Sequence, residues 1–204
     1  MNNTAFNFEI RRKAFHICAI AMPILYLLTS KIIMGIILTI IAGTTLYIDI
    51  SRHYDKKIKG VIDKFLGQFL RFSEKTGSFA LSGASYMAFG FLITCLFFSQ
   101  GLAITSWLIL IISDSFAALI GMKFGSPVIN GKSYIGSAAF FLSAIFISIL
   151  SYFTIGYTTS FMIIIISSFF ATLVELFSKQ IGIDDNFSIP VTYALSTFIL
   201  GLML

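Results

Sequence analysis

Apolar stretches long enough to cross a membrane occupy most of this chain of 204 residues. A hydrocarbon core about 30 Å thick needs roughly 20 apolar residues per helix, with about 17 as a practical minimum. Seven stretches meet or approach that length: residues 14–30, 32–48, 80–98, 102–120, 137–155, 158–176 and 187–204. The chain is 57% hydrophobic and only 11% charged, which soluble domains of this size do not show. We therefore expect an all-α polytopic integral membrane protein with about seven transmembrane helices, forming a single membrane-embedded domain over residues 1–204.

The first apolar stretch follows Arg11, Arg12 and Lys13, an arrangement that also begins a secretory signal peptide. No small-x-small cleavage site follows Leu28, and further apolar stretches come after it. We therefore interpret the first stretch as a retained transmembrane helix.

Every Lys, Arg, Asp and Glu except Lys31 can be placed on one side of this membrane. The positive-inside rule makes that side cytoplasmic. We therefore expect a protein of the plasma membrane, the inner membrane of a bacterium, with its N-terminus and its active site in the cytoplasm. Acidic residues contribute little to the rule, so their presence on the same side is a separate indication of function. The net charge of +5 follows from topology and anionic headgroups and requires no nucleic-acid partner.

The longest stretch between the expected membrane helices runs from residue 49 to 78. Within it, Lys56, Lys57, Lys59, Asp63 and Lys64 alternate with apolar side chains that recur at spacings of three and four. These apolar residues are Ile58, Val61, Ile62, Phe65, Leu66, Phe69 and Leu70. This periodicity predicts an amphipathic helix along the cytoplasmic interface. Two interpretations stay open, a connector whose apolar face lies among headgroups and the floor of a lipid site.

Two short strings near the cytoplasmic side combine acids and bases. Glu9, Arg12, Lys13 and His16 stand at helical spacings of three and four, which places them on one face of the first helix. The basic side chains of that face could hold phosphate, and His16 could orient a group or titrate. In the second string, Arg71-x-x-Glu74, the glutamate could bind a metal or pair with the arginine. An ordinary positively charged flank is the alternative for the first string.

Asp114 lies about seven residues inside an apolar stretch, which corresponds to a depth of roughly 10 Å. A carboxylate in the membrane is costly, so it faces a protein-lined cavity and indicates function, with a structural polar contact between helices as the alternative. Ala117, Ala118 and Gly121 share its face, so the backbone of a neighbouring helix can approach closely there.

The string Gly131-Lys132-Ser133 suggests phosphate binding but is no Walker motif, because Ser126 stands where the first glycine belongs. Glycine still lets backbone N–H groups approach phosphate, Lys132 supplies charge, and Ser133 can cap the next helix or contact a metal.

The last string places Glu175 near the end of one apolar stretch and Asp184-Asp185-Asn186 before the next. Adjacent carboxylates and an amide supply the hard oxygen ligands that Mg²⁺ prefers. The alternative assigns Asp185, Asn186 or Ser188 to the N-cap of the last helix, with a proline in its first turn.

These strings occur in one order along nearly the whole chain: Glu9-x-x-Arg12-Lys13-x-x-His16, Arg71-x-x-Glu74, Asp114-x-x-Ala117-Ala118-x-x-Gly121-x-x-Phe124-Gly125, Lys132-Ser133-x-x-Gly136-Ser137, Ala171-Thr172-x-x-Glu175 and Asp184-Asp185-Asn186-x-x-x-Pro190. In these residues the chain resembles the membrane family of dolichol kinase, phytol kinase and CTP-dependent diacylglycerol kinase, which is distantly related to CDP-diacylglycerol synthase.

The resemblance implies transfer of the γ-phosphate of CTP, with Mg²⁺, to the hydroxyl of a membrane lipid alcohol such as polyprenol, phytol or diacylglycerol. It implies catalytic roles for Asp114, Lys132 and Glu175, with Asp114 as the candidate general base. Implied contacts to the nucleotide phosphates come from Arg12, Lys13, Lys123, Gly125, Gly131, Lys132 and Ser133. Implied metal ligands are Asp114, Glu175, Asp184 and Asp185, and supporting residues are Glu9, His16, Arg71, Glu74 and Asn186.

Two other functions remain as alternatives. A cytidylyltransferase like CDP-diacylglycerol synthase would use the same CTP and Mg²⁺ but would attack the α-phosphorus. That group resembles Lys-Thr-x-Glu-Gly where this chain has Ile135 in place of the acid, and its C-terminal His-Gly-Gly signature is missing here. A small non-enzymatic transporter would not explain why acids and bases gather on one side of the membrane.

Overall fold

The computed structural model describes residues 3–66, 80–126, 131–157 and 159–203. In that part the chain folds into helices and loops, and the all-α prediction is confirmed. The helices are α1 (Asn3–Cys18), α2 (Ala21–Leu28), α3 (Lys31–Tyr54), α4 (Lys56–Leu66), α6 (Gly83–Phe97), α7 (Gln100–Leu108), the π-helical turn η1 (Ile109–Ser113), α8 (Asp114–Phe124), α9 (Tyr134–Thr154), α10 (Phe161–Ile181) and α11 (Asp185–Met203).

Within the described residues, five helical segments are long and apolar enough to cross a membrane: Lys31–Tyr54, Gln100–Phe124, Tyr134–Thr154, Phe161–Ile181 and Asp185–Met203. The shorter apolar helix α6 covers most of another predicted stretch. The first predicted stretch, residues 14–30, is not one helix, because the chain leaves the α-helix after Cys18 and begins α2 at Ala21. α4 confirms the beginning of the amphipathic helix, and residues 67–70 of that prediction lie outside the described part.

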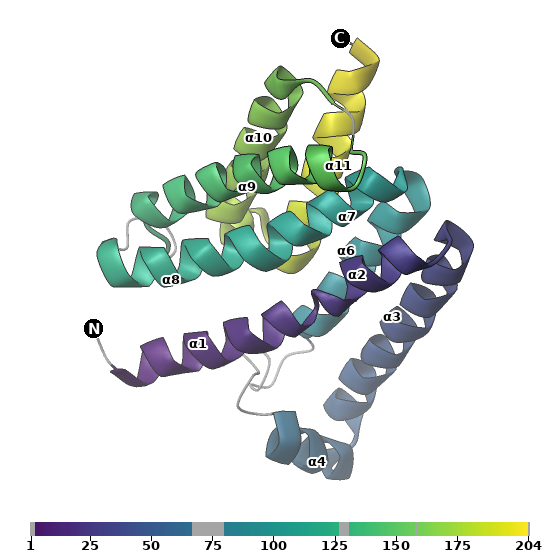
Figure 1. Ribbon diagram of the computed structural model, residues 1–204. Coiled ribbons are helices and arrows are strands. Elements are labelled where there is room, and N and C mark those ends of the chain that lie inside the picture. The colour runs from purple at the N-terminus through teal and green to yellow at the C-terminus, as the bar shows by residue number, and fades with distance from the viewer. Residues whose placement is uncertain (1–2, 67–79, 127–130, 158, 204) are drawn as a thin grey trace.

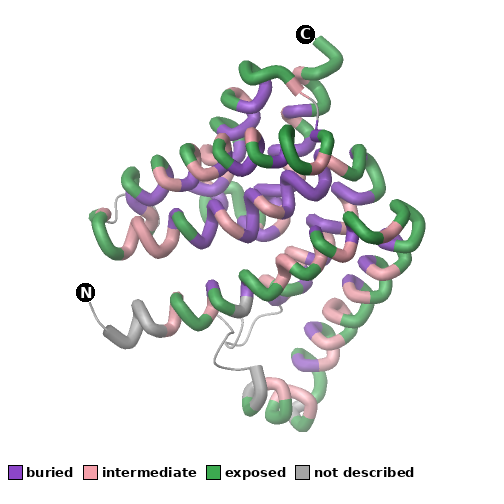
Figure 2. The backbone as a smooth tube through the Cα atoms, in the orientation of Figure 1, coloured by how far each residue is buried: buried purple, intermediate pink, exposed green. Residues whose placement is uncertain are grey.

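The segment formed by α7, η1 and α8 runs through the centre of the bundle (Figure 1). It is the most buried of the membrane-length segments, because 67% of an 18-residue apolar stretch within it is buried inside the protein. α9 packs along α8, α10 packs on α11, and α11 packs in turn on α6. α3 packs against α6 and diverges from α1 and α2, while buried residues follow the inner faces of the helices (Figure 2).

An aromatic stack joins three of these helices away from the charged residues. The indole of Trp107 in α7 lies between Tyr26 of α2 and Phe91 of α6, with ring centroids at 5.3 and 4.5 Å. Its Nε1 donates a hydrogen bond to Thr94 Oγ1 at 2.6 Å, so the one polar atom of the indole is satisfied. This stack fixes α2 and α6 against the central helix.

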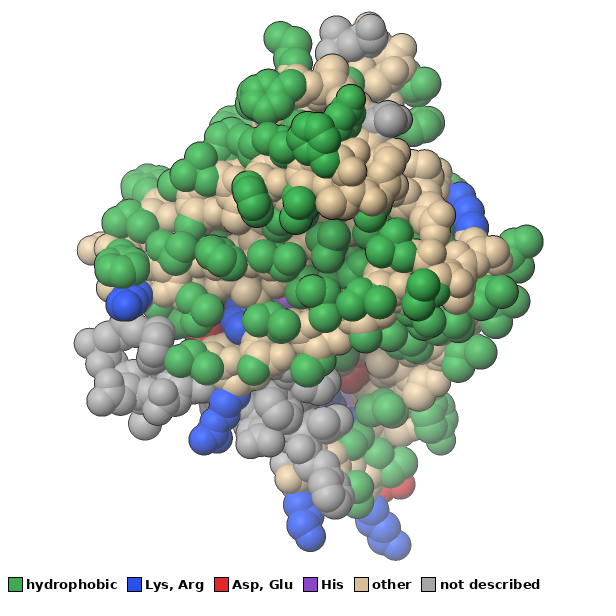
Figure 3. Space-filling model, in the orientation of Figure 1, with side chains coloured by type: hydrophobic (Ala, Val, Ile, Leu, Met, Phe, Trp, Pro, Cys, Tyr) green, Lys and Arg blue, Asp and Glu red, His purple; other side chains and the backbone are tan. Residues whose placement is uncertain are grey.

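Large hydrophobic side chains cover much of the outer surface. The most exposed of them include Leu28, Ile32, Phe97, Phe146, Phe153 and Leu202. In the view of Figure 3, most Lys and Arg side chains lie along α1, at the end of α8 and around α4, and hydrophobic side chains dominate the rest of the face. An apolar surface of this extent suits a bilayer, which agrees with the expectation of an integral membrane protein.

Small residues bring α8 and α9 into close contact. A Cβ atom on Gly136 would lie 2.7 Å from Ala117 O and 3.2 Å from the Cα of Gly121. The prediction that Ala117 and Gly121 permit a close backbone approach is thereby confirmed. The same contact brings the residues before α9 against the end of α8, where part of the candidate site lies.

We expect Gly136→Ala to destabilise the protein by about 1–3 kcal/mol, because the added methyl group overpacks the contact with Ala117. The matched control is Gly43→Ala in α3, where no atom lies within 4 Å of the added Cβ. That control should be neutral or slightly stabilising, because alanine is the better helix former. Thermal unfolding of both variants in one detergent measures the difference, and equal midpoints would contradict the packing described.

Candidate functional site

A buried ion pair links the first helix to the central one. Lys13 Nζ of α1 contacts Asp114 Oδ2 of α8, and their side chains are 2% and 5% exposed. His16, one turn further along α1, has its Nε2 3.8 Å from the same Asp114 oxygen and 3.2 Å from Leu110 O. The prediction that Lys13 and His16 share a functional face is consistent with this geometry, because both turn toward Asp114.

A π-helical turn directly precedes Asp114. η1 spans Ile109–Ser113, and such turns are rare insertions that often occur at functional sites. His16 reaches the carbonyl of Leu110 within this turn, so its Nε2 donates when it carries the proton. The turn therefore brings a backbone acceptor and the Asp114 carboxylate to the same imidazole.

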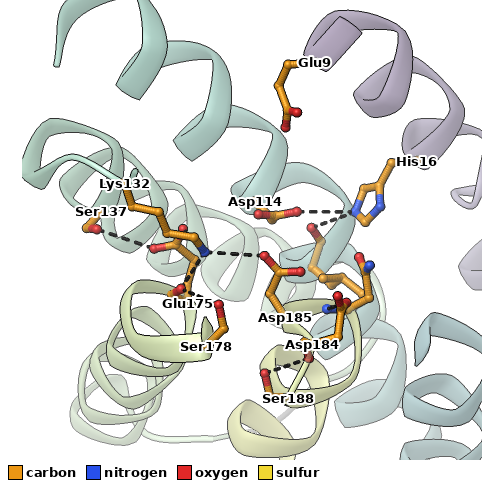
Figure 4. Close-up of polar contacts among 12 residues, drawn as sticks. Glu9, His16, Asp114, Lys132, Ser137, Glu175, Ser178, Asp184, Asp185 and Ser188 are labelled. Atoms are coloured by element: carbon orange, nitrogen blue, oxygen red, sulfur yellow. Dashed lines mark hydrogen bonds and ion pairs between the residues drawn. The ribbon is translucent and has the colours of Figure 1, made fainter. Parts of the chain in front are cut away.

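A second group of charges surrounds Lys132, which lies just before α9. Its Nζ is 2.7 Å from Glu175 Oε1 of α10 and 3.4 Å from Asp185 Oδ2 of α11, and it also donates to the Glu175 carbonyl. Ser137 donates to the other Glu175 oxygen at 3.4 Å. One lysine thus joins three helices, and Figure 4 shows Asp114 between this group and His16.

Opposing effects act on the ammonium of Lys132. Burial disfavours its charged form, but the carboxylates of Asp185 and Glu175, with a further contribution from Asp114, outweigh burial and raise its pKa above the ordinary value. Lys132 therefore stays positively charged at neutral pH and presents an ammonium to three acids.

Local backbone geometry holds Lys132 in this place. Gly131 has a φ of 83°, a backbone conformation that residues other than glycine rarely adopt. Ser133 caps α9 by accepting a hydrogen bond from Gly136 N at 3.1 Å, as one of the predicted roles for this serine requires. Gly125 packs directly on Ser133, and a Cβ there would lie 2.2 Å from Ser133 Oγ. Gly125 and Ser133 thus have structural roles, and their phosphate contacts stay predictions.

Lys123 is placed differently from the other lysines of the predicted phosphate set. Its side chain is exposed at the end of α8, with Nζ 5.2 Å from the centroid of the Phe124 ring. The structure does not bring it to the acids around Lys132 in the contacts described. Lys179, which was not among the predicted residues, lies near the loop that carries Lys132. A Cβ on Gly131 would be 4.0 Å from Lys179 Nζ.

Asp184 directly precedes the last helix. Its Oδ1 accepts a hydrogen bond from Asn186 N at 2.9 Å, and Ser188 Oγ donates to its carbonyl at 3.0 Å. The alternative that gave the N-cap to Asp185, Asn186 or Ser188 is therefore wrong by at least one residue. Capping by Asp184 leaves the carboxylate of Asp185 directed to Lys132.

The predicted metal ligands divide between the two groups. Asp114 contacts Lys13, Glu175 and Asp185 contact Lys132, and Asp184 caps α11. Among the residues that the structure describes, no three His, Cys, Asp or Glu side chains form a group that could hold a metal ion by themselves. Metal binding by these acids stays a prediction.

The remaining predicted residues are placed as follows. Glu9 pairs with Arg12 on α1, where Arg12 Nε donates to Glu9 Oε2 at 3.1 Å. Asn186 is buried near the start of α11. Arg71 and Glu74 lie outside the described residues.

A buried polar group that was not among the predicted site residues lies near the C-terminal end of α3. Asp49, 3% exposed, accepts hydrogen bonds from Ser82 N, Ser82 Oγ and Ser85 Oγ at 2.8, 2.9 and 2.6 Å. Arg52 lies 3.5 Å from the other Asp49 oxygen. The spacing of three between this acid and this base, directly after an apolar stretch, is the signal that could have identified the pair.

A cavity of about 340 Å³ opens between α1, α2, α3 and α6. Arg12, His16, Asp49, Arg52, Ser82 and Asn186 are among its polar lining residues, and most of the other lining side chains are apolar. His16 therefore borders the cavity on one side and Asp114 on the other.

Comparison with known proteins identifies one relative along the whole chain. The chain is 52% identical over 199 residues to "Uncharacterized protein RP860" of Rickettsia prowazekii (strain Madrid E), a match that covers 98% of both chains. It belongs to the same family as that protein.

Part of the chain is also similar to two plant proteins. It is 34% identical over 98 residues to "Probable phytol kinase, chloroplastic" of Triticum aestivum, covering 43% of this chain and 33% of the wheat protein. It is 29% identical over 133 residues to "Probable phytol kinase 1, chloroplastic" of Oryza sativa subsp. japonica, covering 59% of this chain and 42% of the rice protein. No family model and no solved structure matches the chain.

We expect Lys13→Met to destabilise the protein by about 3–5 kcal/mol, because it leaves the Asp114 carboxylate buried without its partner. The double variant Lys13→Met/Asp114→Leu should regain much of that loss, since it removes both charges together. Unfolding midpoints of the wild type, both single variants and the double variant form a double-mutant cycle. Additive losses would show that the two side chains do not interact.

Proposed function

We propose that this protein is a membrane lipid-alcohol kinase that transfers the γ-phosphate of CTP to a lipid hydroxyl. The observation that carries the proposal is the arrangement of two lysine–carboxylate groups, around Lys13 and around Lys132, inside an apolar bundle. The partial similarity to plant phytol kinases supports the same class of reaction.

Phosphoryl transfer depends on positioning and on neutralising charge more than on covalent chemistry by the protein. Lys132 is held charged at the edge of the bundle by Glu175 and Asp185, and we assign it to the nucleotide phosphates. Lys13 and Arg12 supply further positive charge from α1. In this assignment an incoming triphosphate competes with the carboxylates for the same ammonium group.

The acceptor side of the reaction falls to Asp114 and His16. The lipid hydroxyl attacks the γ-phosphorus, the bond from that phosphorus to the β–γ bridging oxygen breaks, and CDP leaves. The hydroxyl proton passes to the Asp114 carboxylate, either directly or through the imidazole that stands 3.8 Å from it. Asp114 is thus the proposed general base and His16 the group that orients the hydroxyl.

Mg²⁺ fits this site as a partner of the nucleotide. The ion is commonly bound by one or two carboxylates together with substrate phosphates rather than by a full set of protein ligands. Glu175 and Asp185 converge on one point, because both contact Lys132 Nζ within 3.4 Å. We assign these two acids as the protein ligands of Mg²⁺, which when bound would neutralise charge on the phosphates.

The decisive experiment supplies purified protein with CTP labelled in either the α- or the γ-phosphate, together with Mg²⁺ and a panel of lipid alcohols. We expect label to reach the lipid from the γ-position and not from the α-position. Transfer from the α-position alone would overturn the proposal in favour of the cytidylyltransferase alternative, and ATP in place of CTP tests the choice of nucleotide.

Asp114→Asn and Lys132→Ala should each reduce γ-label transfer by about 100-fold or more, because each removes a charge from the proposed site. The matched controls are Asp55→Asn and Lys57→Ala, which alter exposed residues just before and in the first turn of α4. Asp55 accepts a hydrogen bond from Lys57 N, a capping role that asparagine also fills, so folding is preserved. Near-normal transfer by both site variants would refute the assigned site.

A further inference from the structure

We infer that the cavity between α1, α2, α3 and α6 holds the hydrocarbon chain of the lipid alcohol, with the hydroxyl at its His16 end. This inference rests on the proposed function and assigns a substrate site within it. It also commits to one chain, because 340 Å³ lies at the lower end of the roughly 300–1,000 Å³ typical of ligand pockets.

The lining of the cavity changes from polar to apolar along the helices. On α3, Arg52 and Asp49 line one end and Leu38 the other. Along α6, its N-cap Ser82 lines the polar end and Phe91 the apolar end. The gradient therefore runs in the same direction on both helices. An amphiphile with one polar head and one long apolar tail matches this lining.

The length of the cavity suits a long chain. Fourteen residues separate Leu38 from Arg52, which corresponds to roughly 21 Å along α3 at 1.5 Å per residue. That distance is about two thirds of a hydrocarbon core about 30 Å thick. A chain lying in this cavity thus stays at membrane depth while its head reaches the level of the charged residues.

The polar end of the cavity leads to the proposed general base. His16 lines the cavity, and its Nε2 lies 3.8 Å from Asp114 Oδ2. Asp49 is already occupied by three hydrogen bonds from Ser82 and Ser85, so it fixes the wall rather than the substrate. A hydroxyl at this end therefore meets the imidazole first.

Two side chains report directly on occupancy. Cys18 lines the cavity and is exposed, whereas Cys95 is buried, so a thiol reagent distinguishes them. Phe91 lines the cavity and stacks on Trp107, the one tryptophan of the sequence. Binding in the cavity should therefore slow alkylation of Cys18 and shift the emission of Trp107.

The test uses the full chain in phospholipid nanodiscs without nucleotide, with phytol or geranylgeraniol as the probe and diacylglycerol as the comparison. We expect the single-chain alcohols to slow alkylation of Cys18 several-fold and to shift Trp107 emission, and diacylglycerol to do so far less. Cys18→Ser verifies the source of the thiol signal. Equal protection by diacylglycerol would overturn the single-chain assignment, and no response to either alcohol would overturn the site.

Filling the cavity provides an independent test. Ala88→Leu adds bulk to the lining from α6, and Ala138→Leu adds the same bulk to an exposed position on α9. We expect the first variant alone to lose protection of Cys18, with both unfolding at similar temperatures. γ-Label transfer without any protection would overturn the cavity site and leave the kinase proposal intact. Protection without γ-label transfer would overturn the kinase proposal and leave the cavity site intact.

Discussion

The ion pair between Lys13 and Asp114 is the interaction on which the arrangement of the site depends. Both side chains are nearly inaccessible to solvent in an otherwise apolar bundle, where an isolated charge is costly. Their contact holds α1 against the central helix and thereby positions His16 beside the same carboxylate. If α1 moved away, Asp114 would lose its partner and the cavity would lose the wall that carries His16.

The second group of charges depends on a different principle. Lys132 stands at the point where α9, α10 and α11 come together, and its carboxylate partners come from the last two of these helices. The close approach of α8 and α9 at Gly136 brings this point near Asp114. Figure 4 shows the result, in which residues far apart in the sequence lie around one region of the bundle. Small side chains let α8 and α9 approach closely, and this approach brings the charged side chains of the two groups near each other.

Periodicity could predict that Lys13 and His16 share a face, but not which group that face would meet. Asp114 is 101 residues away from Lys13, and no local pattern encodes a pairing across that distance. The break between α1 and α2, by contrast, has a local signal, because Pro23 lacks the N–H that would bond to Ala19 O and its ring clashes with that carbonyl. At the start of α11, two adjacent aspartates look equivalent in sequence. Only the backbone geometry shows that Asp184 caps the helix while Asp185 contacts a lysine.

The π-helical turn before Asp114 also determines which residues of the central helix share a face. A turn with one extra residue rotates everything that follows by about 100° relative to an uninterrupted α-helix. The helical wheel of α7, which directs Trp107 toward Tyr26 and Phe91, therefore cannot be continued through Asp114. The aromatic side chains and the carboxylate thus follow two different helical registers within one continuous helical segment. Shortening η1 by a single residue would merge these registers and turn the carboxylate away from α1, without removing any charged group from the chain.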